Sequence, residues 1–247
     1  MLEKMADFFE NRLNGYDEHM LTAIESANEF YPFTAKMLPA VENCCILDLG
    51  CGTGLLGLLL LQRQPQLTVT GIELNEDAAA LGQRCAAENG IQDRLMIRQA
   101  DLREVRRLFP TGSFDLVVCN PPYYPPKSGR TAESGAICSA RSEVTCTLED
   151  VCAAASYLLR WGGRLCLVHK PERLTDVLCA LRAHAMEPKR LRFVCAAAGS
   201  APSLLLVEGC RGGKSGLTME PPLILTDDSG APTAEVDAIY FRKEETP

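Results

Sequence analysis

Short apolar segments alternate with longer amphipathic ones along most of this chain. The clearest apolar segment, residues 114–119, is apolar on both faces, which predicts a strand buried within a parallel sheet. The amphipathic segments between the apolar ones predict helices. In the first half, the predicted strands are 44–49, 67–73, 95–99 and 114–119, and the predicted helices are 55–63 and 76–89, with Gly90 as the C-cap of the second helix.

The second half continues this alternation and then changes to two successive strands. The elements predicted here are helices at 148–159 and 171–184, a turn at Gly162-Gly163, and strands at 164–169, 191–196 and 203–208. The last two strands are close enough in sequence to pair as a hairpin. The whole pattern predicts an α/β fold, a Rossmann-like doubly wound sheet of seven strands with a C-terminal antiparallel hairpin.

The length of 247 residues suits one sizeable domain. Residues 1–40 are amphipathic and rich in aromatic side chains, which predicts an N-terminal helical extension that covers the sheet or closes over a ligand. The main domain is expected over 41–247, with the tail from Leu217 onward packed on its surface. The polar segment 124–147 is too long for a simple connection and is therefore expected to be a functional loop.

Composition narrows the class of protein. No apolar run is long enough to span a membrane and the first ten residues do not resemble a signal peptide, so we expect a cytoplasmic protein. The net charge of −7 argues against a protein that coats nucleic acid non-specifically. Twelve cysteines are present, but there is no Cys-x-x-Cys pair and only three histidines, so we expect buried free thiols and no metal.

A glycine-rich turn, residues 50–54, lies between the first predicted strand and helix. Together with Gly57 it satisfies the dinucleotide pattern Gly-x-Gly-x-x-Gly, and Glu73 lies at a suitable distance to bind a ribose, so a nicotinamide dinucleotide has to be considered. However, Asp48 would repel a pyrophosphate and instead suits the cationic amino-acid end of a ligand. Asp101, after the third strand, can accept a hydrogen bond from an adenine amine.

The strand at 114–119 ends in Asn120-Pro121-Pro122-Tyr123. The two prolines stop the strand and hold the next residues in a rigid extended turn. An amide side chain, rigid carbonyls and an aromatic ring therefore project from the carboxyl end of a strand, where ligands bind in open α/β sheets. This motif has no role in hydride transfer and favours a planar substrate with an exocyclic amine.

Taken together, these motifs resemble the class I S-adenosylmethionine-dependent methyltransferases, and the last motif resembles their amino-methyltransferase branch. The resemblance implies S-adenosylmethionine as cofactor, S-adenosylhomocysteine as product, and methyl transfer to an amine conjugated to a ring or carbonyl. The implied cofactor-binding residues are Asp48, Gly50, Cys51, Gly52, Gly54, Glu73, Leu74, Asp101, Leu102 and Asn120. The implied catalytic residues are Asn120, Pro121, Pro122 and Tyr123, where Asn120 and the Pro121 carbonyl accept from the amine and Tyr123 stacks on the base.

From residue 146 to 241 the chain resembles the tRNA adenine-N6 methyltransferases that act on adenine 37 of valine tRNA. Segments that carry this resemblance include Gly162-Gly163-Arg164, the run 167–174 and Glu187-Pro188-Lys189-Arg190-Leu191. Residues 1–40 do not share it. The resemblance implies a tRNA partner; from the composition we expect no membrane and no metal partner, and the sequence leaves open whether the protein is a monomer or a homodimer. Basic side chains expected to contact RNA phosphates are Lys127, Arg130, Arg141, Lys189 and Arg190.

Other acceptors remain open. A protein glutamine N5-methyltransferase uses the same motif, but it usually carries a larger helical substrate domain before the glycine turn than the forty residues present here. Another rRNA or DNA amino-methyltransferase is a further alternative. DNA methylation is the less favoured of these, because the methyltransferase domain leaves no room for a sizeable target-recognition domain. A catalytically idle RNA-binding or S-adenosylmethionine-binding protein is disfavoured by the intact Asn-Pro-Pro-Tyr motif.

Overall fold

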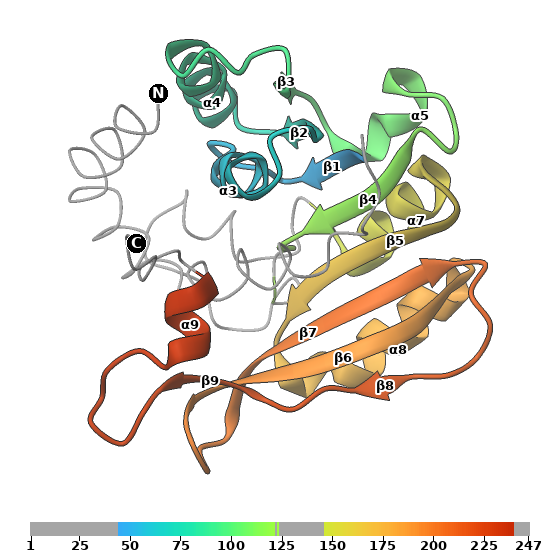
Figure 1. The fold of residues 1–247 in the computed structure, drawn as a ribbon. Coiled ribbons are helices and arrows are strands. Elements are labelled where there is room, and N and C mark those ends of the chain that lie inside the picture. Colours follow the sequence, from blue (N-terminus) through green and yellow to red (C-terminus); the bar gives the residue numbers. More distant parts are fainter. Residues whose placement is uncertain (1–43, 122, 124–145, 240–247) are drawn as a thin grey trace, which may run out of the picture.

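The computed structural model describes residues 44–121, 123 and 146–239. The helical extension predicted over 1–40, the catalytic candidate Pro122, and most of the predicted loop at 124–147 lie outside these residues. Within the described part, one mixed sheet forms the centre of the molecule, and helices lie on both of its faces (Figure 1).

The first half of the chain builds the parallel side of the sheet, and the strand order places β1 between β2 and β4. Its elements are β1 (Cys45–Leu49), α3 (Leu55–Arg63), β2 (Thr68–Glu73), α4 (Glu76–Glu88), β3 (Leu95–Gln99), η1 (Leu102–Glu104), α5 (Val105–Leu108) and β4 (Phe114–Cys119). The order reverses direction between β1 and β4, which creates the switch point where open α/β sheets bind ligands.

The second half completes the sheet with antiparallel strands. Its elements are α7 (Leu148–Leu158), β5 (Leu159–His169), η2 (Pro171–Arg173), α8 (Leu174–Ala183), β6 (Met186–Ala197), β7 (Pro202–Arg211), β8 (Thr218–Met219), β9 (Leu223–Thr226) and α9 (Ala234–Ile239). The strand order is β3-β2-β1-β4-β5-β7-β6-β8, with β9 also paired to β6. β7 inserts antiparallel between β5 and β6, while β8 and β9 run parallel to β6.

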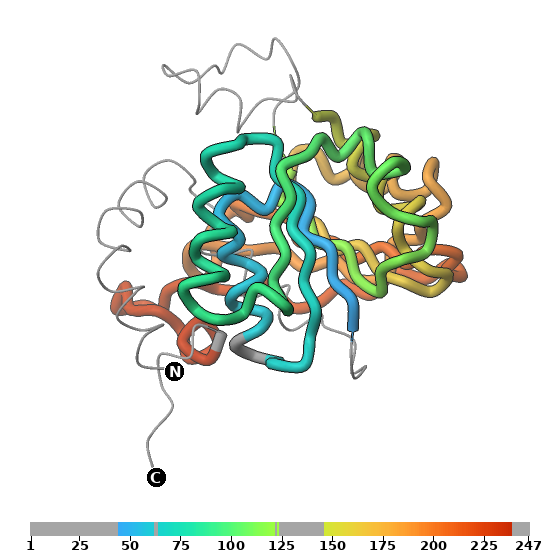
Figure 2. The backbone as a smooth tube through the Cα atoms, turned by 90° about the horizontal axis from the view of Figure 1, so that it is seen from above, coloured from blue at the N-terminus to red at the C-terminus, as the bar shows by residue number. Residues whose placement is uncertain are grey.

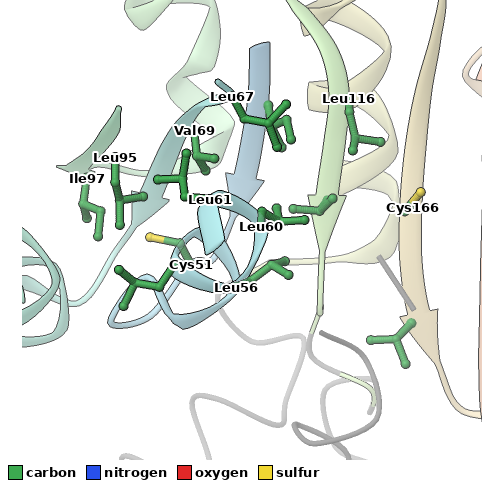
Figure 3. Close-up of a cluster of buried hydrophobic side chains, with 14 of the residues drawn as sticks. Cys51, Leu56, Leu60, Leu61, Leu67, Val69, Leu95, Ile97, Leu116 and Cys166 are labelled. Carbon is green, nitrogen blue, oxygen red and sulfur yellow. The ribbon is translucent and has the colours of Figure 1, made fainter. Parts of the chain in front are cut away.

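Neighbouring residues of the central strands point to opposite faces of the sheet and feed two separate cores. Ile46 and Leu116 belong to the core under α3 and α4, whereas Leu47 and Val117 belong to the core under α7 and α8. Viewed from above, α3 and α4 lie on one side of the sheet and α5, α7 and α8 on the other (Figure 2). Figure 3 shows the first core, in which leucines of α3 pack on β1 to β4. This double burial explains the continuous apolar runs of the strands.

The predicted Rossmann-like α/β fold is confirmed, and two short strands extend the predicted seven. The tail, which was expected only to pack on the surface, adds β8 and β9 along the otherwise free edge of β6. The Gly162-Gly163 turn becomes an irregularity inside β5, where the pairing with β4 jumps from Leu159 to Arg164. Of the two predicted domains, the structure describes most of the main one and none of the N-terminal extension, so the predicted boundary stays a prediction.

Candidate active site

The carboxyl ends of four parallel strands bring the predicted site residues to one edge of the sheet. Leu49, the last residue of β1, lies between Ile72 of β2 and Cys119 of β4. Gly50 follows Leu49, Glu73 follows Ile72 and Asn120 follows Cys119, so these three residues come from adjacent strand ends. Neighbouring strands lie about 4.8 Å apart, so a single small molecule can contact all three positions.

The glycine turn is held against the end of β2 by its own backbone. The amides of Gly50 and Cys51 both donate to the carbonyl of Ile72, at 2.8 and 3.1 Å. Gly50, Gly52 and Gly54 have φ values of 74°, 53° and 81°, in the left-handed region that favours glycine. The turn therefore needs these glycines for its conformation.

The glycines of the turn differ in what surrounds them. A Cβ added at Gly50 or Gly52 would meet nothing within 4 Å, so the backbone there borders open space. A Cβ at Gly54, the N-cap of α3, would lie 2.5 Å from Cδ1 of Ile97, and one at Gly57 would lie 2.6 Å from Cδ1 of Leu95. The first two glycines thus leave room for a ligand, while the last two permit close packing of α3 on the sheet.

Glu73 is fixed in place at the end of β2. Its Oε2 accepts a hydrogen bond from the Gly52 amide and its Oε1 accepts one from the Asn75 amide, each at 2.8 Å. An ionised carboxylate can accept about four hydrogen bonds, so two positions remain for ligand hydroxyls. Asn75 in turn caps α4 by accepting from the Ala78 amide. The side chain predicted to bind a ribose is therefore preorganised by backbone donors.

Asp48 is buried beneath the turn, in register with Gly71 of β2 and Val118 of β4. Burial, with a smaller contribution from the nearby Glu73 carboxylate, raises the pKa of Asp48 to about 8. Burial also raises the pKa of the Cys51 thiol far above its usual range, with Asp48 and Glu73 adding to the effect. Cys51 is thus a buried neutral thiol, and Asp48 is an acid whose ionised form would be favoured by a cationic ligand.

Asp101 lies after β3 and already has a partner that the sequence prediction did not include. Its carboxylate accepts from the Arg103 amide at 2.9 Å and from the Arg103 guanidinium, whose Nε lies 2.9 Å from Oδ2. These hydrogen bonds lower the pKa of Asp101. Leu102 packs partly on the second core, and Leu74 is an exposed apolar side chain directly after Glu73. An adenine amine bound here would have to share Asp101 with Arg103.

The Asn-Pro-Pro-Tyr corner stands at the end of β4. The Tyr123 hydroxyl donates to Oδ1 of Asn120 at 2.6 Å, and the Tyr123 ring is buried in the core under α3. Pro121 is also buried. The acceptor oxygen predicted to bind the substrate amine therefore has one hydrogen bond from within the motif and one acceptor position left.

The end of β5 surrounds Tyr123, and this contact was not predicted from the sequence. The His169 ring meets the Tyr123 ring edge-on, with centroids 5.6 Å apart, and Nζ of Lys170 lies 5.5 Å from the Tyr123 centroid. Nη1 of Arg173 donates to the Tyr123 carbonyl at 3.3 Å. Arg173 also borders a cavity of about 320 Å³, together with Thr147, Leu148, Glu149, Asp176 and Cys179. The sequence signals were the basic residues that follow β5 and the place of the run 167–174 in the family resemblance, neither of which indicated a contact with Tyr123.

The structure describes two of the five residues that were predicted to contact RNA. Lys127, Arg130 and Arg141 lie outside the described residues. Lys189 and Arg190 lie on β6, where Nζ of Lys189 donates to the Lys214 carbonyl at 3.0 Å. Arg190 pairs with the buried Glu208 at 3.0 Å and with Glu220 at 3.2 Å. Arg190 therefore has internal carboxylate partners in addition to any role on RNA.

The described residues contain neither a cluster of metal-ligating side chains nor a helix that could cross a membrane. Across 44–121, 123 and 146–239, no three His, Cys, Asp or Glu side chains are grouped so that they would hold a metal ion. In the same part of the chain, none of the helices has the length and apolar character needed to cross a membrane. The cysteines described there carry free thiols, and most of them are buried.

Known proteins resemble this chain in sequence. The methyltransferase small domain family matches residues 32–178. A tRNA1(Val) (adenine(37)-N6)-methyltransferase of Porphyromonas gingivalis W83 is 37% identical over 68% of this chain and 65% of its own length. The protein of the same name from Dickeya chrysanthemi is 31% identical over 77% of this chain and 76% of its own length. The match to the first relative thus spans slightly less than two thirds of that protein.

Solved structures resemble the chain in fold. A predicted O-methyltransferase from Agrobacterium tumefaciens has a TM-score of 0.68 and 24% identity, over 84% of this chain and 94% of that chain. A geranyl diphosphate methyltransferase solved in complex with S-adenosylmethionine has a TM-score of 0.55 and 19% identity, over 80% of this chain and 90% of that chain. At these identities the likeness shows the fold alone.

Proposed function

Because this chain belongs to the methyltransferase small domain family, we propose that it methylates the exocyclic N6 amine of an adenine in tRNA, using S-adenosylmethionine. Adenine 37 of valine tRNA is the proposed position, since relatives at 31% and 37% identity carry that activity in their names. A tRNA substrate implies action in the cytoplasm. We assign the methyltransferase domain to residues 41–247, although the family match begins slightly earlier, at residue 32.

The residues at the strand ends suit S-adenosylmethionine, which when bound supplies an activated methyl group on a sulfonium centre. The open backbone at Gly50 and Gly52 leaves space beside the turn, and the buried Asp48 carboxyl offers a counter-charge to a cationic ligand. Glu73, oriented by two amides, has acceptor positions left for two ribose hydroxyls. Leu74 offers an apolar surface for an adenine ring.

The observation that carries the proposal is the position of Asn120 at the end of β4, one strand from the glycine turn. An exocyclic amine on a purine is a poor nucleophile because its lone pair is delocalised into the ring. Hydrogen bonds from its two N–H groups to Asn120 Oδ1 and the Pro121 carbonyl would draw the nitrogen toward a tetrahedral form. Catalysis then consists mainly of positioning and requires no strong base.

Tyr123 and the basic residues complete the proposed substrate site. We assign Tyr123, with Pro121 and Pro122, to the corner that receives a base unstacked from the RNA. In the structure its hydroxyl orients Asn120 and its ring is buried, so stacking of a base on this ring requires one of its faces to become uncovered when the substrate binds. Lys127, Arg130, Arg141 and Lys189 are assigned to phosphate contacts, which should weaken steeply with salt.

The test is methylation of bacterial tRNA. The purified protein is incubated with S-adenosylmethionine and total tRNA, and the nucleosides are analysed by mass spectrometry. We expect N6-methyladenosine to increase, and valine tRNA with adenine 37 replaced by guanine to remain unmodified. Methylation of a release-factor glutamine without methylation of tRNA would instead establish the protein substrate.

A matched variant separates catalysis from cofactor binding. Asn120→Ala removes the acceptor oxygen without touching the glycine turn, so kcat should fall by about 10²-fold or more while the Kd for S-adenosylmethionine changes by less than about threefold. Equal losses of turnover and cofactor affinity would contradict the role proposed for Asn120.

A further inference from the structure

His169 is the last residue of β5 and stands beside the Asn-Pro-Pro-Tyr corner. Cys119 of β4 pairs with Leu167 of β5, so two residues further on Pro121 and His169 reach the same level of the sheet. The His169 side chain is fully buried, and its ring packs edge-on against the Tyr123 ring at an interplanar angle of 60°. This histidine therefore supports the proposed catalytic corner from the neighbouring strand.

The two nitrogens of His169 have different surroundings. Nδ1 accepts a hydrogen bond from the Lys170 amide at 2.9 Å, so the neutral ring carries its proton on Nε2. Burial, helped by the Arg173 and Lys170 cations and opposed by Asp176, lowers the pKa of His169 to about 4. Nε2 is buried and has no hydrogen-bond partner among the residues that the structure describes.

An unpaired buried donor reduces stability, so the imidazole is not explained by its contribution to the core. Its ring contact leads instead to the catalytic amide. The Tyr123 hydroxyl donates to Oδ1 of Asn120 at 2.6 Å, and this hydrogen bond fixes the orientation of the Asn120 amide group. Movement of the Tyr123 ring would break that bond and let the Asn120 side chain turn.

We propose that His169 is a positioning residue for methyl transfer, which holds the Tyr123 ring in the one orientation where its hydroxyl reaches Asn120. This inference rests on the proposed function of the same corner. The effect of His169 passes through Tyr123, whose backbone carbonyl is anchored separately by Arg173. Loss of the His169 ring should therefore loosen the Tyr123 side chain but leave the glycine turn and cofactor binding intact.

The position of the Tyr123 ring can be measured without any activity. The chain has six tyrosines, so fluorine NMR of protein labelled with 3-fluorotyrosine gives few resonances, and Tyr123→Phe identifies the one of interest. His169→Leu should move that resonance toward the position of an exposed tyrosine, and His169→Phe, which keeps a flat ring, should move it less. An unchanged Tyr123 resonance in His169→Leu would overturn the proposal.

The kinetic test uses a double-mutant cycle. His169→Leu should lower kcat about three- to tenfold, the value of one edge-to-face aromatic contact, with Kd for S-adenosylmethionine changed by less than about twofold. If His169 acts through Tyr123, adding His169→Leu to Tyr123→Leu should lower kcat no further. Losses that multiply in the double variant would refute the proposed route.

A second variant separates the ring contact of His169 from its N–H donor. His169→Gln keeps an N–H donor near the Nε2 position but removes the ring, so it should lose as much kcat as His169→Leu. Wild-type kcat in His169→Gln would show that the donor matters and the ring contact does not, which also refutes the proposal. A wild-type protein that makes no N6-methyladenosine refutes the proposed function instead, and the fluorine NMR measurement still decides the role of His169.

Discussion

At the scale of single residues, the two aspartates of the site have opposite properties. Asp48 is buried, and burial raises its pKa to about 8, whereas Asp101 is paired with Arg103, which lowers its pKa. Asp48 is therefore mostly protonated at neutral pH, and a bound cation would favour its ionised form. Asp101 stays ionised, and a ligand amine that binds it must compete with a guanidinium for the same oxygens.

The raised pKa of Asp48 predicts that cofactor binding depends on pH. Its ordinary value is 3.8, so between about pH 4 and 8 the folded protein keeps a proton that the unfolded chain releases; the stability associated with this group is fully present below about pH 4 and is lost progressively as the pH rises to about 8. A bound cation favours the ionised carboxylate, so binding near pH 7 should release close to one proton. Affinity for S-adenosylmethionine should then fall by up to about tenfold per pH unit below about 8.

Isothermal titration calorimetry in buffers of different ionisation enthalpy measures the released proton directly. The control is Asp48→Asn, which is neutral at every pH and nearly the same shape, so its proton release should be close to zero. Its thermal stability near pH 7 should exceed that of the wild type, because the wild-type chain must take up a proton at Asp48 on folding there and the amide of asparagine need not. Wild-type affinity that is constant between about pH 6 and 8 would contradict this role of Asp48.

At the scale of elements, the unit formed by β1, the glycine turn and α3 was predicted closely from the sequence. α3 (Leu55–Arg63) and β3 (Leu95–Gln99) have the predicted bounds, since a glycine N-cap and the apolar runs mark them locally. β5 begins five residues before its predicted start at 164, because the strand continues through the glycine irregularity. The pairing of Asp101 with Arg103 depends on side-chain geometry that no periodicity encodes.

Substitutions in the glycine turn should separate its two tasks. Gly50→Ala imposes a left-handed conformation on alanine, which costs about 1–2 kcal/mol, but the new methyl group meets no protein atom within 4 Å. Gly54→Ala carries the same strain and also places its methyl group 2.5 Å from Ile97. Urea denaturation should therefore show a larger stability loss for Gly54→Ala, whereas calorimetry should show the larger loss of cofactor affinity for Gly50→Ala. The reverse order would mean that the open side of Gly50 does not face the ligand.

At the scale of the whole molecule, the sequence predicted the parallel half of the sheet better than its outer edge. The Asn-Pro-Pro-Tyr corner and the glycine turn come from adjacent strands because the order reverses at β1 and β4, a consequence of the alternating pattern. β8 and β9 are two and four residues long, too short for a periodic signal, and they form only because β6 offers an unpaired edge. The contacts of His169 with Tyr123 likewise arise only once β5 lies beside β4.

Two neighbouring basic residues near the far edge of the sheet, Lys189 and Arg190, have different partners. Glu208 is buried on β7, and it has Arg164 and Arg190 as ion-pair partners at 3.0 Å each. Arg190→Ala would leave that carboxylate with less compensation, so unfolding free energy should drop by about 1–3 kcal/mol. Lys189→Ala removes a side chain that bonds only one carbonyl among the described residues, so stability should change by less than about 0.5 kcal/mol.

Comparing these two neighbours therefore separates a fold residue from a surface residue that contacts RNA. If Lys189 binds a phosphate, Lys189→Ala should reduce the slope of log affinity for tRNA against log salt by about one, because one fewer counterion is released. For Arg190→Ala we expect a lower midpoint in urea but an affinity and salt slope close to those of the wild type, measured where the variant is fully folded. Arg190→Lys, which keeps the charge but not the forked geometry, should fall between wild type and alanine in stability. A stable Arg190→Ala protein with a reduced salt slope would instead place Arg190 on the RNA surface, and its ion pairs with Glu208 and Glu220 would then be dispensable.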